Sequence, residues 1–409
     1  MRDKESQHYF GLDIGTSMVR CVVGMLEASD DSRLSVIGHG SSPNLGMRKG
    51  SIVHLDDVVD AIVKAITEAE RVSGVHIQSA TVNVNGAHVS GINSKGVIAI
   101  SAANREIDDN DRLRVEEAAT IVQLPPNREI IQVFAKNYSV DGQDNIKDPV
   151  GMHGIRLEVD THIVTASTPS LRNLDSVLDK ARVVPVHRTV SSLASAEAVL
   201  NRQQKESGTL LLDIGAGTTN MVVVEDGEVQ HVAVIPVGGT NITNDLAIGL
   251  KTDLDIAEKV KITHASLQDD RPKGRINVEH DGRKHFFEAD DVHMITEARI
   301  EELLELVDKE LKKIHRSRKL PGGVVFVGGT ANLPGLASFA KDKLQLASRV
   351  GKLQPMGGLI DTVQDPGYAS AVGLMMLDML LMPGDAPVSG QPNGNVFGFV
   401  DGLFKKFKR

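Results

Sequence analysis

The sequence has few cysteines and aromatic residues, which form disulfides in secreted proteins and interfacial anchors in membrane proteins. It contains one cysteine and no tryptophan among 409 residues, and aromatic side chains make up only 3%. The single thiol, Cys21, cannot form a disulfide within one chain and is typical of a reducing compartment. The N-terminal segment MRDKESQHYFGLDIG is polar where a signal peptide needs an apolar stretch, and no run of about 18 apolar residues occurs. We therefore expect a cytoplasmic protein without a membrane-spanning helix.

The chain also has fewer positively charged than negatively charged residues. The chain has 45 Lys and Arg against 54 Asp and Glu, which gives a net charge of −9. A general nucleic-acid-binding protein needs an extended basic face, so nucleic acid is not an expected partner. A length of 409 residues is enough for several domains, each with its own core.

One distant internal repeat organises the sequence. Residues 9–23 and 210–224 each contain an apolar strand, an Asp, a glycine turn with hydroxyl side chains, and a second strand. This pattern is typical of a β-hairpin. Asp13 and Asp213 lie 200 positions apart, far more than the roughly 20–50 residues of a solenoid repeat. The repeat therefore predicts two similar domains that face each other.

Hydrophobic periodicity predicts the main elements between and after the two hairpins. Helices are expected at 55–71, 108–122, 245–264, 292–315 and 368–382, and strands at 79–101, 129–166 and 323–327. Residues 266–291 are polar and are expected to form a loop with short strands. The segment PGDAPVSGQPNG, residues 383–394, has the composition of a flexible linker.

The two hairpin turns carry the residue types that bind phosphate. Glycine allows a tight turn and a close approach, and successive N–H groups with hydroxyls form an anion-binding concavity. A carboxylate beside it would repel phosphate unless a divalent cation intervenes, so Asp13 and Asp213 are predicted to hold Mg²⁺ through water. For one turn alone, an ordinary tight hairpin is an equal alternative. The second copy and a third glycine turn at 328–330 argue against that alternative.

These motifs resemble those of the actin/Hsp70/sugar-kinase superfamily. The matching segments are residues 11–17 (phosphate-1), 211–221 (phosphate-2), 323–336 (adenosine) and 365–375 (second connecting motif). Residues 130–157, with the sequences YSVDG and DPVGM, are similar to the subdomain of the bacterial FtsA family, and the resemblance covers about residues 8–382 plus the tail. It implies an α/β fold with two RNase-H-like domains around a nucleotide cleft that binds ATP with Mg²⁺.

The resemblance also implies a division into domains. The first RNase-H-like domain (1A) would comprise residues 1–83, 164–207 and 356–382, with an inserted subdomain (1C) at 84–163. The second (2A) would comprise 208–241 and 293–355, with a small subdomain (2B) at 242–292. A linker at 383–395 and a membrane-targeting helix at 396–409 would follow.

Turns and resemblance together predict one set of cofactor-binding residues. By the resemblance, Glu258 and Lys261 border the ribose and adenine, although an ordinary solvated helix face with i,i+3 pairing would look the same. The full set is Asp13, Gly15, Thr16, Ser17, Asp213, Gly215, Gly217, Thr218, Thr219, Gly238, Gly239, Glu258, Lys261, Gly328, Gly329 and Thr330. Actin-like ATPases position water with a Gln or Glu in the first connecting helix, and residues 187–200 offer only Glu197. Hydrolysis is therefore expected to be slow at most.

The scarce aromatics concentrate in the tail, where four of the ten Phe occupy the last 13 residues. On a helical wheel the apolar residues cover an arc of about 160°, opposite the cations, which is typical of an interfacial helix. The predicted membrane-binding residues are Val396, Phe397, Phe399, Val400, Leu403, Phe404 and Phe407, with Lys405, Lys406, Lys408 and Arg409. The alternative is a helix that docks on the protein's own body.

Resemblance to the FtsA family implies a scaffold at the division site. Such a protein tethers filaments of the tubulin-like FtsZ to the cytoplasmic face of the inner membrane through anionic lipids, forms actin-like filaments itself, and helps to recruit other divisome proteins. It would bind the FtsZ C-terminal peptide through subdomain 2B, residues 242–292. The alternatives are a type IV pilus adaptor similar to PilM, and a sugar or acetate kinase. The basic amphipathic tail favours the FtsA-like function over both.

Overall fold

The N-terminal hairpin lies at the centre of a six-stranded sheet, the first sheet. The computed structural model describes residues 7–26, 34–101 and 104–381. Strand order in the first sheet is β11-β6-β1-β2-β3-β19. The strands are β1 (Gln7–Ile14), β2 (Met18–Leu26), β3 (Leu34–Pro43), β6 (Ser79–Val84), β11 (Val184–Val190) and β19 (Gly357–Gly358).

Helices α1 (Leu55–Ser73) and α11 (Ala369–Leu380) pack closely on the first sheet because glycines let them approach. Helices α3 (Thr168–Lys180) and α4 (Ser191–Val199) also contact this sheet. A Cβ at Gly11 of β1 would lie 2.2 Å from the carbonyl oxygen of Ala371 in α11, and one at Gly40 of β3 would lie 2.1 Å from that of Ala65 in α1. Any larger residue would push these helices off the sheet.

The second copy of the repeat forms an equivalent hairpin in a separate five-stranded sheet, the second sheet. Its order is β14-β13-β12-β17-β18. The strands are β12 (Thr209–Ile214), β13 (Thr219–Glu225), β14 (Glu228–Ile235), β17 (Gly323–Val327) and β18 (Ser348–Val350). The hairpin register is the same in both sheets: Asp13 lies opposite Arg20, and Asp213 lies opposite Asn220. The structure thus confirms the two related α/β halves predicted from the repeat.

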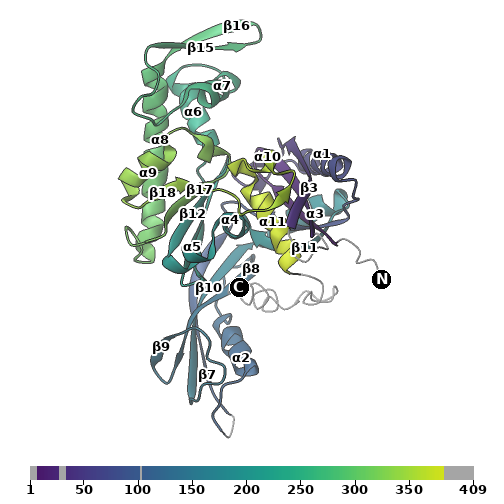
Figure 1. Cartoon of the computed structure of the whole chain (residues 1–409), viewed down its shortest axis with the longest axis vertical. Coiled ribbons are helices and arrows are strands. Elements are labelled where there is room, and N and C mark those ends of the chain that lie inside the picture. The colour runs from purple at the N-terminus through teal and green to yellow at the C-terminus, as the bar shows by residue number, and fades with distance from the viewer. Residues whose placement is uncertain (1–6, 27–33, 102–103, 382–409) are drawn as a thin grey trace.

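A third, antiparallel sheet extends from the foot of the molecule (Figure 1). Its order is β7-β10-β8-β9. It contains β7 (Ser90–Ala99), β8 (Arg128–Val140), β9 (Gln143–Ile146) and β10 (Arg156–Ser167), with helix α2 (Asp109–Ala119) against it. Helix α2 begins at a capping box between Asp108 and Asp111.

The opposite end of the molecule carries helices and one hairpin (Figure 1). These elements are α6 (Gly239–Gly249), α7 (Leu254–His264), β15 (Arg275–His280), β16 (Arg283–Glu288) and α8 (Ala289–Lys313). The single helix predicted at 245–264 is wrong: α6 begins at Gly239 and ends where Lys251 adopts a positive φ of 53°. A left-handed residue directly after a helix ends it, and a lysine gives no sequence signal for that conformation.

The other predicted elements are present with small shifts in their ends. The helices expected at 55–71, 108–122, 292–315 and 368–382 correspond to α1, α2, α8 and α11. The remaining elements are β4 (Met47–Arg48), β5 (Ser51–Ile52), α5 (Arg202–Ser207), η1 (Gly329–Asn332), α9 (Leu336–Leu344), α10 (Ile360–Val363) and η2 (Pro366–Tyr368). Within the described ranges, no helix combines the length and apolar character needed to cross a bilayer.

Candidate functional site

The two hairpin turns open onto one cavity of about 380 Å³ between the first and second sheets. Most of the predicted binding residues line it: Asp13, Gly15, Thr16, Ser17, Asp213, Gly215, Thr218, Gly239, Glu258, Lys261, Gly328, Gly329 and Thr330. Gly217, Thr219 and Gly238 are not among the lining residues. The sequence repeat and the three glycine turns therefore converge on one place in the fold.

The three predicted residues that do not line the cavity help to fix the conformation of the turns. The Thr219 hydroxyl donates to the Val237 carbonyl at 2.8 Å, which ties the second hairpin to the start of α6. A Cβ at Gly217 would lie 2.9 Å from the Thr16 side chain, so the two turns touch. A Cβ at Gly238 would lie 2.6 Å from the Gly215 carbonyl oxygen, so only glycine fits there.

The turns have the same hydrogen-bond geometry. Gly15 N–H donates to the Met18 carbonyl at 3.0 Å, and Gly215 N–H donates to the Thr218 carbonyl at 2.9 Å. In the part of the chain that the structure describes, the intervening N–H groups donate to no other residue; they belong to Thr16, Ser17, Ala216 and Gly217. Successive unpaired N–H groups in a tight turn form a site for anionic oxygens.

Asp13 is buried at the base of the cavity, with only 7% of the residue exposed. The Asn83 amide donates to its Oδ1 at 2.7 Å, and the Ser370 hydroxyl donates to the same oxygen at 3.2 Å. Asn83 is held in turn by the backbone N–H of Ile14, at 2.8 Å. Burial raises the pKa of Asp13 to about 7, the Asp213 carboxylate adds to the rise, and Arg20 and the Ser370 hydrogen bond oppose it.

Asp213 is the equivalent buried carboxylate of the second hairpin, and it accepts from the Ser195 hydroxyl at 2.9 Å. Burial raises its pKa as well, against the Ser195 hydrogen bond and the charge of Arg20. Burial raises the pKa of both carboxylates, and a divalent cation beside them would stabilise their ionised forms. Among the described residues no group of three or more His, Cys, Asp or Glu could hold a metal. Two carboxylates fit Mg²⁺, which keeps several of its own waters.

Helices α6 and α7 supply another wall of the cavity. The Lys261 ammonium lies 2.6 Å from the Glu258 carboxylate, 2.9 Å from the Thr243 hydroxyl and 3.2 Å from the Gly239 carbonyl. The i,i+3 pair therefore exists and lines the cavity, with the Lys261 side chain 17% exposed and that of Glu258 44% exposed. Gly239 begins α6, so the positive end of that helix also opens onto the cavity.

The glycine turn after β17 completes the wall. Gly328 has a φ of 84°, and a Cβ there would lie 2.5 Å from an Asp213 carboxylate oxygen. Its N–H donates to the Pro366 carbonyl at 2.9 Å, which joins this turn to η2. A side chain at this position would displace Asp213 from the cavity.

Comparison with known proteins identifies the family. A model described as "Cell division protein FtsA" matches residues 210–373, and one described as "SHS2 domain inserted in FTSA" matches residues 86–165. The cell division protein FtsA of Bacillus subtilis is 40% identical over 372 residues, which cover 90% of this chain and 82% of that protein. That of Pseudomonas aeruginosa is 34% identical over 370 residues, which cover 90% and 88%. The chain belongs to the FtsA family of cell division proteins.

Solved structures extend the likeness to the actin-like fold. The PilM–PilN type IV pilus biogenesis complex matches with a TM-score of 0.63 at 18% identity, covering 90% of this chain and 98% of that chain. MreB5 of Spiroplasma citri bound to ADP matches with a TM-score of 0.54 at 13% identity, covering 91% and 96%. At these identities the likeness shows the fold alone. It gives no support to the pilus-adaptor and kinase alternatives, whereas the FtsA relatives match over nearly the whole chain.

In this FtsA-family site, sequence analysis missed several lining residues. They are Met18, Arg20, Asn85, Ser191, Ala216, Asn220, Ile242, Ile262, Asn332, Leu333, Pro334, Gly367 and Ser370. The repeat contained a signal for two of them, because Arg20 and Asn220 each lie seven residues after an aspartate and opposite it in the hairpin. The Arg20 guanidinium lies 5.1 Å from the centre of the Tyr368 ring, which holds this cation at the cavity wall.

The structure does not bring Glu197 to the cavity. Its carboxylate pairs with the Lys205 ammonium of α5 at 2.6 Å, and both side chains are largely buried. Helix α4 instead turns Ser191 and Ser195 toward the two aspartates. Glu197 lies two residues beyond Ser195, which places it on the far side of the helix. The tail, including the predicted membrane-binding residues from Val396 to Arg409, lies outside the described residues.

Proposed function

We propose that this FtsA-family chain binds Mg·ATP in the cavity and anchors FtsZ filaments to the inner face of the cytoplasmic membrane at the division site. The pair of equivalent turns, each with a buried aspartate, is the observation that carries the nucleotide part. Family membership supports the division role, actin-like self-association, and recruitment of other divisome proteins.

Three groups of cavity residues would contact three parts of Mg·ATP: the phosphates, the metal ion and the nucleoside. The unpaired N–H groups of the two turns, together with Arg20, would hold the phosphates. Asp13 and Asp213 would hold hydrated Mg²⁺, which supplies charge neutralisation between carboxylates and phosphates. Glu258, Lys261 and the turn at 328–330 would border the ribose and adenine.

Turnover is expected to be slow at most. Helix α4 contributes only Ser191 to the cavity lining, and the Glu197 carboxylate pairs with Lys205. A serine hydroxyl can orient water but is a weak base, so proton removal from an attacking water would be inefficient. We therefore propose a nucleotide-dependent scaffold and not a fast ATPase.

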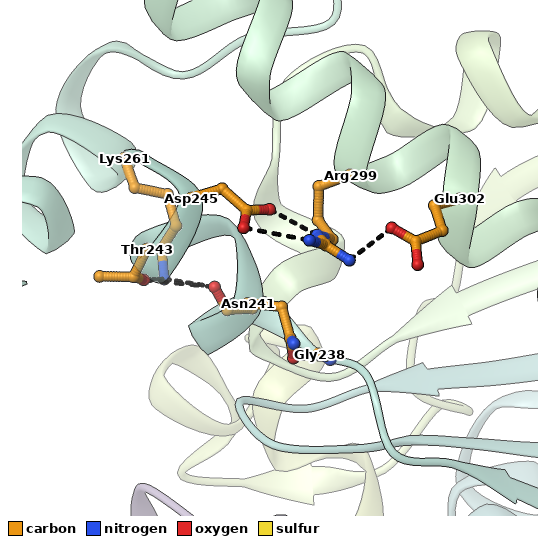
Figure 2. Close-up of polar contacts among 8 residues, drawn as sticks. Gly238, Asn241, Thr243, Asp245, Lys261, Arg299 and Glu302 are labelled. Carbon is orange, nitrogen blue, oxygen red and sulfur yellow. Dashed lines mark hydrogen bonds and ion pairs between the residues drawn. The ribbon is translucent and has the colours of Figure 1, made fainter. Parts of the chain in front are cut away.

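A groove of about 330 Å³ between α6 and α8 is the surface that we propose for the FtsZ C-terminal peptide. Its lining residues are Asp245, Ile248, Gly249, Ile295, Ala298, Arg299 and Glu302. Ile248 is 77% exposed, and the Arg299 guanidinium beside it is held between the carboxylates of Asp245 and Glu302 (Figure 2). The apolar floor suits the apolar side chains of a short peptide, and the guanidinium N–H groups that do not donate to Asp245 or Glu302 can donate to a peptide carboxylate. Helix α6 falls mostly within the proposed subdomain 2B, residues 242–292.

Co-sedimentation with anionic vesicles tests the anchoring function directly. The full chain, vesicles containing about one-third anionic lipid, and a fluorescent FtsZ C-terminal peptide would be mixed and centrifuged. We expect the peptide to pellet only when chain and vesicles are both present. Peptide that stays in the supernatant while the chain pellets would argue against the anchoring function.

Reversing the charge of Arg299 should abolish capture of the peptide. Arg299→Glu would place a third carboxylate beside Asp245 and Glu302, and it would repel a peptide carboxylate. We expect at least a ten-fold loss of peptide affinity by fluorescence anisotropy. Arg271→Glu is a matched control, because Arg271 pairs with Glu297 of the same helix but does not line the groove. Equal losses in the two variants would remove the groove from the proposal.

A further inference from the structure

The free edge of the second sheet is covered by the inserted domain, residues 86–165. Strand β14 ends the order of that sheet, so one side of its backbone has no strand partner there. The backbone N–H of Val232 in β14 donates to the Nε2 of His162 in β10, at 2.9 Å. A side chain of one domain thus satisfies the exposed strand edge of another.

His162 is fixed in the form that this contact requires. Its Nδ1 lies 2.8 Å from the Asn93 side-chain oxygen and therefore carries the proton, which leaves Nε2 as an acceptor. The residue is 1% exposed, and burial lowers its pKa to about 3, with the His231 and Lys136 charges acting in the same direction. The His231 ring lies 5.3 Å away and itself faces Glu310. At neutral pH the imidazole accepts from Val232 without competition from a second proton.

Close packing accompanies this hydrogen bond. A Cβ at Gly91 of β7 would lie 2.3 Å from the His162 Nε2 and 2.6 Å from the Val232 carbonyl oxygen. A second contact lies in the turn that precedes β14, where the Lys147 ammonium donates to the Asp226 carbonyl at 2.8 Å. The inserted domain therefore holds both β14 and the turn that precedes it.

Strand β14 leads directly from this contact to the cavity. Two residues after the strand, the Val237 carbonyl accepts from Thr219 at the second hairpin. Gly239 follows, lines the cavity, and donates its N–H to the Gly215 carbonyl at 2.9 Å. A shift of β14 along or away from its sheet would move this turn.

We propose that docking of the inserted domain on β14 sets the position of the turn at 238–239, so that His162 and Gly91 act as positioning residues for nucleotide affinity. Neither residue lines the cavity. The proposal rests on nucleotide binding as proposed above. Because coupling is reciprocal, nucleotide in the cavity must tighten the contact between Val232 and His162.

Two substitutions test the coupling by calorimetry with Mg·ATP. Gly91→Ala inserts a methyl group into the contact, and His162→Ala removes the acceptor. We expect each to weaken Mg·ATP binding about five-fold or more, as typical coupling energies give. His162→Gln, whose amide can accept from Val232 and donate to Asn93, should restore most of the affinity. His187→Ala removes another buried histidine, in β11 of the first sheet, and should leave the affinity unchanged.

Amide hydrogen exchange in the wild-type chain provides the reciprocal measurement and requires no variant. Saturating Mg·ATP should slow exchange of the Val232 amide several-fold. If the wild-type chain binds Mg·ATP but the exchange of the Val232 amide does not change, the proposed coupling is wrong and the proposed function stands. The same conclusion follows if the Gly91→Ala and His162→Ala variants bind Mg·ATP like the wild type. A wild-type chain that binds no Mg·ATP would overturn the proposed function together with it.

Discussion

Replacing Phe404 and Phe407 with Glu should abolish binding of the full chain to anionic vesicles and leave Mg·ATP binding intact. Under the proposed function, the tail enters the membrane interface with its apolar arc inward. Its four cations would contribute roughly 1 kcal/mol each, and each fully buried Phe about 1.5–3 kcal/mol, less the cost of ordering a short helix. Losing two Phe rings removes about 3–6 kcal/mol of that gain, and two carboxylates at the centre of the arc must be desolvated at a further cost of several kcal/mol, so the substitutions together cancel most of the margin for one tail.

Vesicle flotation at two salt concentrations measures this effect. Replacing Lys405 and Lys406 with Ala should weaken binding only in part, and raised salt should mimic it, because surface charge is screened over about 10 Å at 0.1 M salt. Phe286→Glu is the matched control: that ring is 49% exposed on the body of the protein, and its loss should not affect flotation. A variant with Glu at positions 404 and 407 that still floats would refute the anchor.

Asp13→Asn should stabilise the chain at alkaline pH and at the same time weaken its binding of Mg·ATP at least ten-fold. Burial raises the pKa of Asp13 to about 7 from an ordinary value of 3.8, so the folded state holds a proton that the unfolded state releases. The stability contributed by that proton is fully present below the ordinary value and is lost as the pH rises through about 7. An amide cannot ionise, so the variant does not lose stability in this way.

Urea denaturation without Mg²⁺ measures the stability difference. We expect Asp13→Asn to be more stable than the wild type by about 4 kcal/mol at pH 8, and by less than half of that at pH 5. Asn83 and Ser370 can keep their hydrogen bonds to the amide oxygen. The affinity for Mg·ATP falls because a neutral amide holds a hydrated cation poorly.

Asp378→Asn is the control for the affinity measurement. Asp378 is a partly buried carboxylate whose pKa is also raised by burial, but it accepts from Phe10 and Thr81 and does not line the cavity. Its substitution should leave Mg·ATP affinity unchanged. An Asp13→Asn variant with the same free energy of unfolding as the wild type at pH 8 would show that the buried carboxylate does not destabilise the protein in the absence of Mg·ATP.

The parts of the fold that follow from local pattern could be predicted from the sequence. The distant repeat predicted two equivalent hairpins because each copy carries its own strand, aspartate and glycine turn, and the structure has both in the same register. The long amphipathic helices α1 and α8 were likewise visible as periodicity. These features depend on residues that are neighbours in the chain.

The features that sequence analysis missed depend on contacts between distant segments. Ser370 reaches Asp13 only because α11 crosses α4 so closely that a Cβ at Gly373 would lie 1.7 Å from the Ala194 carbonyl oxygen. Likewise, nothing near His162 indicates that its ring accepts from a strand of another sheet 70 residues away. For Glu197 the sequence suggested a role that the structure does not support. Its residue type suited catalysis, but its position on the helix directs the carboxylate to Lys205.

Residues 228–249 connect three parts of the molecule in sequence. Strand β14 contacts the inserted domain, the next residues shape the cavity, and α6 then presents Asp245 and Ile248 to the groove. One extra residue between strand and helix would turn α6 by about 100°, and one within the strand would reverse the faces of its side chains. The spacing from Val232 to Ile248 is therefore under a strict length constraint: substitutions can be tolerated along this segment, whereas a single insertion or deletion would put its three contacts out of register.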